Sequence, residues 1–240
     1  MLSRLIAALV AVAVAAGAAA AGPVHVYGPG GPAPAMKEAA ASFAATRGVK
    51  VEVVAGPTKD WLEQAKGDAD VIYSGSETMM SDFMVALDGQ IAPATAEPLY
   101  LRRSASLGRK GNPKRIKGFQ DLTKPGHRVL VVNGAGQNGL WEDMAGRTGD
   151  IGMVRDLRRN IALYAPTSAA AKAAWVADGS LDAWIIWNIW QVANPQLADV
   201  VEVEPQYRIY RDTGIALTRA GLSNPDATAF AAYLASPEAG

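Results

Sequence analysis

The chain has 240 residues, with 23 Lys and Arg against 23 Asp and Glu, and it contains no Cys. The missing Cys excludes disulfides, thiolate metal sites, Cys nucleophiles and a lipid-modified N-terminal Cys. A formal charge of zero argues against nucleic-acid binding and against a polybasic membrane-surface protein. With 50% hydrophobic and 19% charged residues, the composition is that of a folded protein with room for one large domain or two lobes.

The first 21 residues predict a signal peptide. Arg4 precedes an apolar run to Val14, and small residues lead up to Ala21 and Gly22. The alternative is a transmembrane anchor, but the run is shorter and less apolar than the roughly 20 residues that a span needs. We therefore expect cleavage after Ala21, export to the periplasm and no stable membrane insertion of the mature chain.

Strand and helix patterns alternate from residue 24 onward. The first β-rich runs lie at 24–27, 49–54 and 70–73, and the helical patterns between them lie at 33–46, around Trp61, and at 77–87. Gly48 predicts the C-terminal end of the first helix. Repeated strand–helix units predict a parallel sheet with helices on its faces.

The alternation is interrupted between residues 91 and 118 and then resumes. The interruption contains seven cations that we interpret as a solvated surface outside any cleft: Arg102, Arg103, Arg109, Lys110, Lys114, Arg115 and Lys117. Further β-rich runs lie at 128–133, 161–164, 183–187 and 200–204, and helical patterns lie around 140–144 and at 167–176 and 225–234. Two such sets joined by irregular connections predict two lobes with a cleft between them.

Turns rich in Gly, Pro and hydroxyl residues follow four of the predicted strands. In an open α/β sheet, ligands bind beyond the carboxyl ends of the strands, where helix N-termini offer free N–H groups. The alternative is that these turns only reverse the chain. Four of them together favour an anion site built from backbone N–H groups and short hydroxyls. Its candidate residues are Gly28, Gly30, Gly31, Thr58, Ser74, Gly75, Ser76, Asn133, Gly134, Ala135, Gly136 and Gln137.

Aromatic residues provide candidates for the walls of this cleft. Trp187 and Asn188 lie at the end of a predicted strand, and Tyr27 lies at the end of the first one. We expect Trp187 or Tyr27 to form a wall of the site. Trp184 and Trp190 are interpreted instead as core and hinge packing.

Arg211 lies in the return segment between the predicted lobes. Its guanidinium would neutralise a bound anion through two parallel hydrogen bonds. Equally, it would pair with Asp212 or Asp182 as a salt bridge at the hinge.

Catalytic motifs give little support for an enzyme. The turn at 134–139 matches the dinucleotide fingerprint, but the next strand carries no acid for a ribose, so we expect no cofactor. His25 and His127 are interpreted as structural, and the hydrolase, zinc-protease and phosphate-loop motifs are missing from the sequence. We expect a non-enzymatic protein without a metal site.

Four motifs point to a family: the segments 27–32, 132–143, 183–188 and 207–214. They resemble the accessory colonization factor C family, periplasmic solute-binding proteins related to those for molybdate and sulfate. The resemblance implies a type II periplasmic binding protein fold with two lobes, each a mainly parallel sheet with flanking helices. The implied fold has two crossover strands. It divides the mature chain into lobe 1, residues 22–98 and 210–240, and lobe 2, residues 99–209.

The resulting hypothesis is an exported monomer that closes on a small anion, either an oxyanion such as sulfate or molybdate or a small carboxylate. The closed protein would serve an ABC permease or a membrane sensor. The first two turns contain Gly28-Pro29-Gly30-Gly31 and Gly56-Pro57-Thr58, where sulfate and molybdate binders place Ser, so the sequence does not decide between these ligands. The alternative is a colonization or adhesion factor that acts through its surface, with a vestigial cleft.

Overall fold

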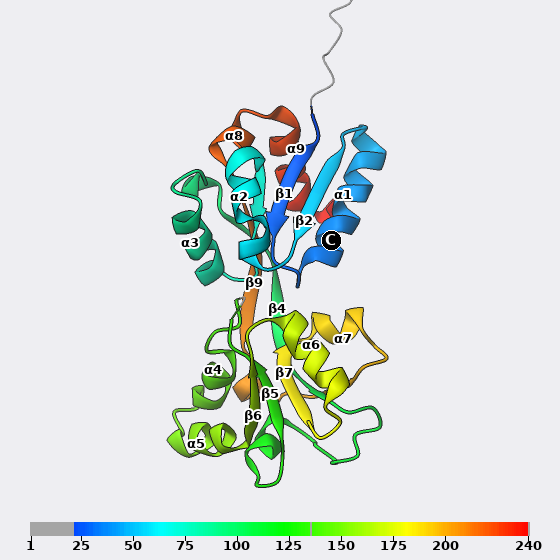
Figure 1. The fold of residues 1–240 in the computed structure, drawn as a ribbon, viewed down its shortest axis with the longest axis vertical. Helices are drawn as coiled ribbons and strands as arrows, with labels where there is room; N and C mark the ends of the chain where they lie inside the picture. Colours follow the sequence, from blue (N-terminus) through cyan, green and yellow to red (C-terminus); the bar gives the residue numbers. More distant parts are fainter. Residues whose placement is uncertain (1–21, 135, 240) are drawn as a thin grey trace, which may run out of the picture.

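The computed structural model describes residues 22–134 and 136–239, so the predicted signal peptide and Ala135 lie outside the described residues. The strands form one sheet in the order β2-β1-β3-β9-β4-β7-β5-β6, with β8 paired to β4. Figure 1 shows the elements gathered into two lobes, with β4 and β9 passing between them. The predicted two-lobed α/β fold is confirmed.

Lobe 1, at the top of Figure 1, is built from strand–helix units and closed by helices from the end of the chain. Its elements are β1 (Val24–Gly28), α1 (Ala33–Arg47), β2 (Val51–Ala55), α2 (Thr58–Asp68), β3 (Val71–Tyr73), α3 (Glu77–Ala86), α8 (Arg219–Leu222) and α9 (Pro225–Leu234). β1 pairs in parallel with both β2 and β3. Gly48 ends α1 in the left-handed conformation (φ 69°), as its position predicts.

Lobe 2 repeats this arrangement. Its elements are β5 (Val129–Val132), α4 (Leu140–Gly146), α5 (Ile151–Asn160), β6 (Ile161–Ala165), α6 (Ser168–Ala177), β7 (Ala183–Trp187), α7 (Ile189–Ala193) and β8 (Asp199–Val201). β5 pairs in parallel with β6 and β7. Helix α5 is not among the predicted elements, although Asp150 caps its start and Met153 and Leu157 are buried on one face.

Two long antiparallel strands connect the lobes: β4 (Glu97–Gly108) and β9 (Tyr210–Leu217). Their register places Arg102 opposite Arg211. β4 then continues into lobe 2, where Ser104 lies opposite Trp187 of β7. Since both strands run unbroken from one lobe into the other, the residue boundaries assigned to the lobes stay a prediction.

The basic segment from 102 to 117 is only partly solvated. Arg102 is 4% exposed, so the expectation of a solvated surface is wrong at this residue. The guanidinium of Arg109 covers the ring of Trp175 at 3.7 Å from its centroid and donates to the carbonyls of Leu181 and Asp178. The burial of Arg102 depends on the strands that flank β4, and these are distant in the sequence. A local sequence pattern therefore does not predict it.

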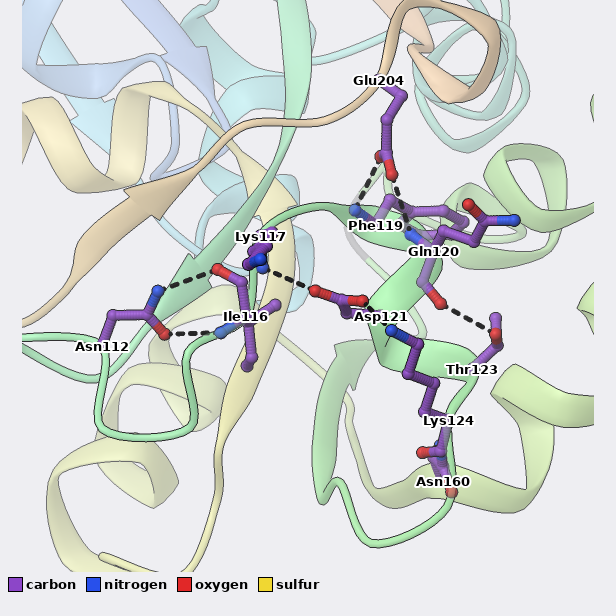
Figure 2. Close-up of polar contacts among 10 residues, drawn as sticks. All are labelled: Asn112, Ile116, Lys117, Phe119, Gln120, Asp121, Thr123, Lys124, Asn160 and Glu204. Atoms are coloured by element: carbon purple, nitrogen blue, oxygen red, sulfur yellow. Dashed lines mark hydrogen bonds and ion pairs between the residues drawn. The ribbon is translucent and has the colours of Figure 1, made fainter.

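The loop between β4 and β5 is held by side-chain hydrogen bonds to its backbone (Figure 2). The carboxylate of Asp121 accepts the N–H of Lys117 at 2.7 Å and the ammonium of Lys124 at 2.5 Å. The carboxylate of Glu204 accepts the N–H of Phe119 at 2.7 Å. The Asp121 contacts hold the loop together, and the Glu204 contact ties it to the segment that precedes β9.

Separate apolar cores fill the two lobes. In lobe 1, the rings of Phe43 on α1 and Phe230 on α9 meet edge to face, with centroids 5.2 Å apart. In lobe 2, Trp141 and Met144 on α4 pack with the apolar side of β5 and β7. Each such buried side chain stabilises the fold by about 1.5–3 kcal/mol relative to an exposed one. Within 22–134 and 136–239, none of the helices combines the length and the apolar character of a membrane span.

Candidate functional site

A cavity of about 380 Å³ lies between the lobes. Lobe 1 contributes the turns after β1, β2 and β3, and lobe 2 contributes the start of α6 and the end of β7. These turns lie beyond the carboxyl ends of parallel strands, which is where open α/β sheets bind ligands. The volume falls within the range of about 300–1,000 Å³ that is typical of small-molecule sites.

Five of the predicted ligand-binding residues line this cavity. They are Gly30, Gly31, Gly75, Gln137 and Trp187. They come from the turns after β1, β3 and β5 and from the end of β7, so the structure brings three turns and a strand end together. The ligand-binding role of these residues stays a prediction.

The other candidates lie outside the lining of the cavity: Tyr27, Gly28, Thr58, Ser74, Ser76, Asn133, Gly134, Gly136, Asn188 and Arg211. Tyr27 is buried in the core of lobe 1, where its hydroxyl donates to Asp68 at 2.6 Å and its ring lies 5.9 Å from that of Trp61. Burial, and next the hydrogen bond to Asp68, raise the pKa of Tyr27 well above its ordinary value. The alternation of side chains along β1 turns Tyr27 away from the cleft.

Several of these residues hold the turns in place. The hydroxyl of Ser76 accepts the N–H of Met79 and thereby caps α3. Gly28 allows a close approach of β1 and β3, because a Cβ there would lie 2.5 Å from the carbonyl oxygen of Tyr73. Gly134 lies against the carbonyl of Pro166, and its positive φ of 158° also favours glycine.

Arg211 forms an ion pair with Asp143, whereas the predicted salt-bridge partners are Asp212 and Asp182. Its Nη2 donates to Oδ2 of Asp143 on α4 at 2.6 Å, and its Nη1 donates to the carbonyls of Gly136 and Asn138 at 3.2 Å. The guanidinium therefore joins crossover strand β9 to the turn after β5. That turn carries Gln137 into the cavity.

Arg102 is the principal lining residue that the sequence reading missed. Its Nη2 donates to the carbonyl of Gly75 and, at 3.1 Å, to the carbonyl of Asp212, while its Nε has no partner within the structure described. The guanidinium lies 5.0 Å from the ring centroid of Trp187. Among the described residues, it forms no ion pair with a carboxylate.

The charge of Arg102 is thus buried and only partly compensated. Burial lowers the pKa of Arg102 to about 10, so the group remains charged at neutral pH. The carboxylate of Asp212 favours the charged form from nearby, but its Oδ1 accepts the N–H of Glu77, and its Oδ2 has no partner among residues 22–134 and 136–239. A buried charge in this state costs free energy that an anion in the cavity would recover.

The start of α6 provides hydroxyl and amide groups beside this charge. Thr167 caps the helix, and Ser168 is its first residue. The hydroxyl of Ser168 lies 2.6 Å from Nε2 of Gln137, whose Oε1 is buried and has no partner in the part of the chain that the structure describes. The positive end of the helix faces the cavity with no acid in its first turn. The turn rule applied to the other strands would also have found this one, since Pro166, Thr167 and Ser168 follow β6.

Apolar groups complete the walls. Pro29, Pro32 and Pro57 come from lobe 1, and Trp190 of α7 faces them from lobe 2. A Cβ on Gly31 would lie 3.9 Å from Nε1 of Trp190, so the two lobes approach each other here. No Asp or Glu is among the lining residues of the structure as described. The lining therefore combines positive charge and hydrogen-bond donors with carbon surface.

Comparison with known proteins agrees with this architecture. Residues 24–240 match the family model described as bacterial extracellular solute-binding protein. The chain belongs to this family. The predicted relationship to periplasmic solute-binding proteins is therefore confirmed.

Solved structures similar to this solute-binding protein include PEB3 from Campylobacter jejuni, with 36% identity and a TM-score of 0.83 over 90% of this chain and 94% of that one. A PEB3 structure with bound L-phospholactate has 35% identity and a TM-score of 0.84 over the same shares of the two chains. The sulfate-binding protein SubI from Mycobacterium tuberculosis has 21% identity and a TM-score of 0.73, covering 91% of this chain and 83% of that one. At that identity the similarity shows the fold alone. The search of curated proteins gave no match.

Proposed function

We propose that this solute-binding protein captures a small anion in the cavity between its lobes. The observation that carries the proposal is Arg102, a buried cation that lines the cavity and, among the residues described, is bonded only to carbonyl oxygens. Positive charge without a carboxylate partner is costly inside a protein and marks a place where an anion gains most. The positive end of α6 adds to the attraction.

The size of the cavity favours an organic anion over a bare oxyanion. Sulfate and molybdate are compact ions of five heavy atoms that present only oxygen atoms to their surroundings. The cavity of about 380 Å³ leaves space for carbon atoms beside the prolines and Trp190. The PEB3 structure that contains L-phospholactate supports a phosphorylated three-carbon acid as the first ligand class to test.

Binding would be coupled to closure of the lobes, and the closed form would be recognised by an ABC permease or by a membrane sensor. The family match supports this role. The two possible partners can be distinguished by comparing the uptake of a labelled ligand in cells that produce the chain and in cells that lack it. Loss of uptake supports the permease, and unchanged uptake with loss of a transcriptional response supports the sensor.

Isothermal titration calorimetry and thermal unfolding test ligand binding. The protein is first unfolded in guanidinium, dialysed and refolded, because a captured ligand would mask binding. It is then titrated with L-phospholactate, inorganic phosphate, sulfate, molybdate and L-lactate, with glycerol as the uncharged control. A ligand at 100 times its Kd should stabilise the protein by about 2.7 kcal/mol. If none of these anions gives heat or raises Tm, the proposal is wrong.

A further inference from the structure

The zero formal charge of the chain conceals a separation of charge between its two lobes. With the predicted boundaries, residues 99–209 carry 15 Lys and Arg against 10 Asp and Glu, whereas residues 22–98 and 210–240 together carry 7 against 13. Charges more than about 10 Å apart are largely screened in salt solution, so the acids of lobe 1 do not cancel the cations of lobe 2. A partner that touches only lobe 2 therefore meets a basic protein.

The exposed cations of lobe 2 gather at the end that faces away from the cavity. The loop 109–128 follows Gly108, which pairs with the first residue of β7, Ala183, and it leads into the start of β5. The cavity lies at the opposite, carboxyl ends of these strands. Helix α5, at the lower end of lobe 2 in Figure 1, ends beside this loop, because Nδ2 of Asn160 donates to the carbonyl of Lys124 at 2.6 Å. We call the exposed cations of the loop and of the end of α5 the distal face: Lys110, Lys114, Arg115, Lys117, Lys124, Arg128, Arg158 and Arg159.

The acids in this region lie beneath the cations and bind the loop backbone. The carboxylate of Asp121 accepts the N–H of Lys117 at 2.7 Å (Figure 2), and the carboxylate of Asp182 accepts the N–H of the residue before β5 at 2.9 Å. The side chains of Asp121 and Asp182 are 18% and 9% exposed, whereas those of their ion-pair partners Lys124 and Lys114 are 67% and 50% exposed. The charge that reaches the surface here is therefore mainly positive.

Three cations of the distal face form no ion pair among residues 22–134 and 136–239. They are Arg115, Lys117 and Arg158. The other five pair with Asp121, Asp156, Asp178, Asp182 and Asp199. The distal face thus has more cations than its neighbouring acids can neutralise.

Apolar anchors are missing from the distal face. Within the described segments 109–128 and 152–160, no large apolar side chain is exposed, since Ile116, Phe119 and Leu122 are buried. Protein interfaces depend on aromatic and apolar residues at their centre, and this face offers none. The phosphate groups of an anionic bilayer need no such anchor, because they attract cations that are spread over a surface. Arginine also binds a phosphate through two parallel hydrogen bonds.

We propose that the distal face docks on the phosphate groups of an anionic membrane surface, without insertion into the bilayer. This goes beyond the proposed function, because docking at this end of lobe 2 leaves the cavity at its other end open to solute. Lobe 1, with its excess of acids, would be repelled by the same surface. The molecule would therefore stand with lobe 2 towards the membrane.

Flotation with lipid vesicles tests the docking, with the chain processed at the predicted signal-peptide site. The protein should bind vesicles that mix phosphatidylglycerol with phosphatidylcholine, and it should not bind vesicles of phosphatidylcholine alone. Added salt should release it, since the attraction is between exposed charges. Equal binding to both kinds of vesicle, binding that salt does not change, or no binding to either would overturn the proposal, the last outcome in favour of an acidic protein partner.

A pair of double variants locates the contact. Lys117→Gln with Arg158→Gln removes two exposed charges that have no ion-pair partner in the described chain. Each lost charge should weaken vesicle binding about fivefold, and the double variant about twenty-fivefold. Lys37→Gln with Arg47→Gln makes the same exchange at exposed positions of α1 in lobe 1 and should bind as the wild type does. Equal losses in the two double variants would contradict docking through the distal face.

Arg102→Met separates docking from capture of a solute. Because Arg102 lines the cavity and lies outside the distal face, this variant should bind vesicles as the wild type does. Loss of vesicle binding in it would overturn the proposal, since the lipid phosphate would then occupy the cavity. A wild-type protein that binds vesicles but no soluble anion would contradict the proposed function and support docking alone. Urea denaturation confirms that each variant is folded.

Discussion

The guanidinium carbon of Arg102 lies 5.0 Å from the ring centroid of Trp187, so a cation on crossover strand β4 faces an aromatic side chain at the end of β7. Both side chains are almost fully buried. The sequence predicts a solvated Arg102 and a Trp187 in the cleft, and the structure brings these two side chains together. Because Nη2 of Arg102 also reaches the carbonyl of Gly75, the contact extends into lobe 1.

Replacement of Arg102 by Met should weaken anion binding at least about thirtyfold, because the ligand loses its buried charge partner. The free energy of unfolding of the ligand-free protein should change by less than about 2 kcal/mol, since removal of a desolvated charge offsets the lost hydrogen bonds. Calorimetry and urea denaturation measure the two effects. Arg103→Met is the control, because the adjacent Arg103 is half-buried and pairs with Glu202 outside the cavity. Similar losses of affinity in both variants would contradict the role given to Arg102.

Asp143→Asn should reduce anion affinity about three- to tenfold, because Arg211 would hold the turn that carries Gln137 less firmly. Stability should fall by no more than about 1 kcal/mol, since half of the Asp143 side chain is exposed. Asp156→Asn removes the exposed pair with Arg159 on α5 and provides a matched control. An Asp143→Asn variant with wild-type affinity would show that the ion pair has no influence on the site.

Gly134→Ala should destabilise the protein by more than about 3 kcal/mol, because the new methyl group meets the carbonyl of Pro166 and the positive φ is strained. Gly149→Ala, at φ 76° with open space around it, should cost only about 1–2 kcal/mol. Urea denaturation of the two variants makes the comparison. Equal losses would mean that the contact with Pro166 is not tight in solution.

Asp121 should make stability depend on pH in the acidic range. The hydrogen bond from Lys124, and next the N–H of Lys117, hold the pKa of this carboxyl below its ordinary value of about 3.9 (Figure 2). A lowered folded-state pKa contributes stability that is present above the unfolded pKa and is lost as the pH falls through the folded one.

Asp121→Asn should therefore flatten the decline of unfolding free energy below about pH 4. Lys124→Met should flatten it as well, because it removes the largest cause of the shift. The double variant should add little to either single one, since both changes remove the same interaction. Urea denaturation from pH 2.5 to 6 gives the curves, and slopes that match wild type in both single variants would contradict the assignment.

Much of the fold could be predicted because its signals are local. Gly48 ends α1 as a left-handed cap, and the alternation of β-rich and helical runs predicted the parallel strands of both lobes. Trp187 was placed at a strand end by its β-branched neighbours, and the structure ends β7 there. These features depend on residues within a few positions of one another, so one sequence contains them.

The site could be predicted only in part because burial on the crossover strands depends on distant residues. Nothing near Arg102 in the sequence shows that β9 and β7 will flank its strand on either side. Tyr27 lies outside the lining of the cavity for a different reason. A strand end predicts where a residue lies but not which face of the sheet its side chain takes, and here the alternation turns it toward Trp61.

The contact between Phe43 on α1 and Phe230 on α9 has a consequence for the order of assembly. The core of lobe 1 is built from segments that lie before and after lobe 2 in the sequence, whereas the elements from β5 through β8 form one uninterrupted stretch. Because the chain is synthesised from the N-terminus, lobe 2 can form its core while lobe 1 still lacks α9. Helix α9, which follows lobe 2 in the sequence, thus completes the core of the lobe that precedes it.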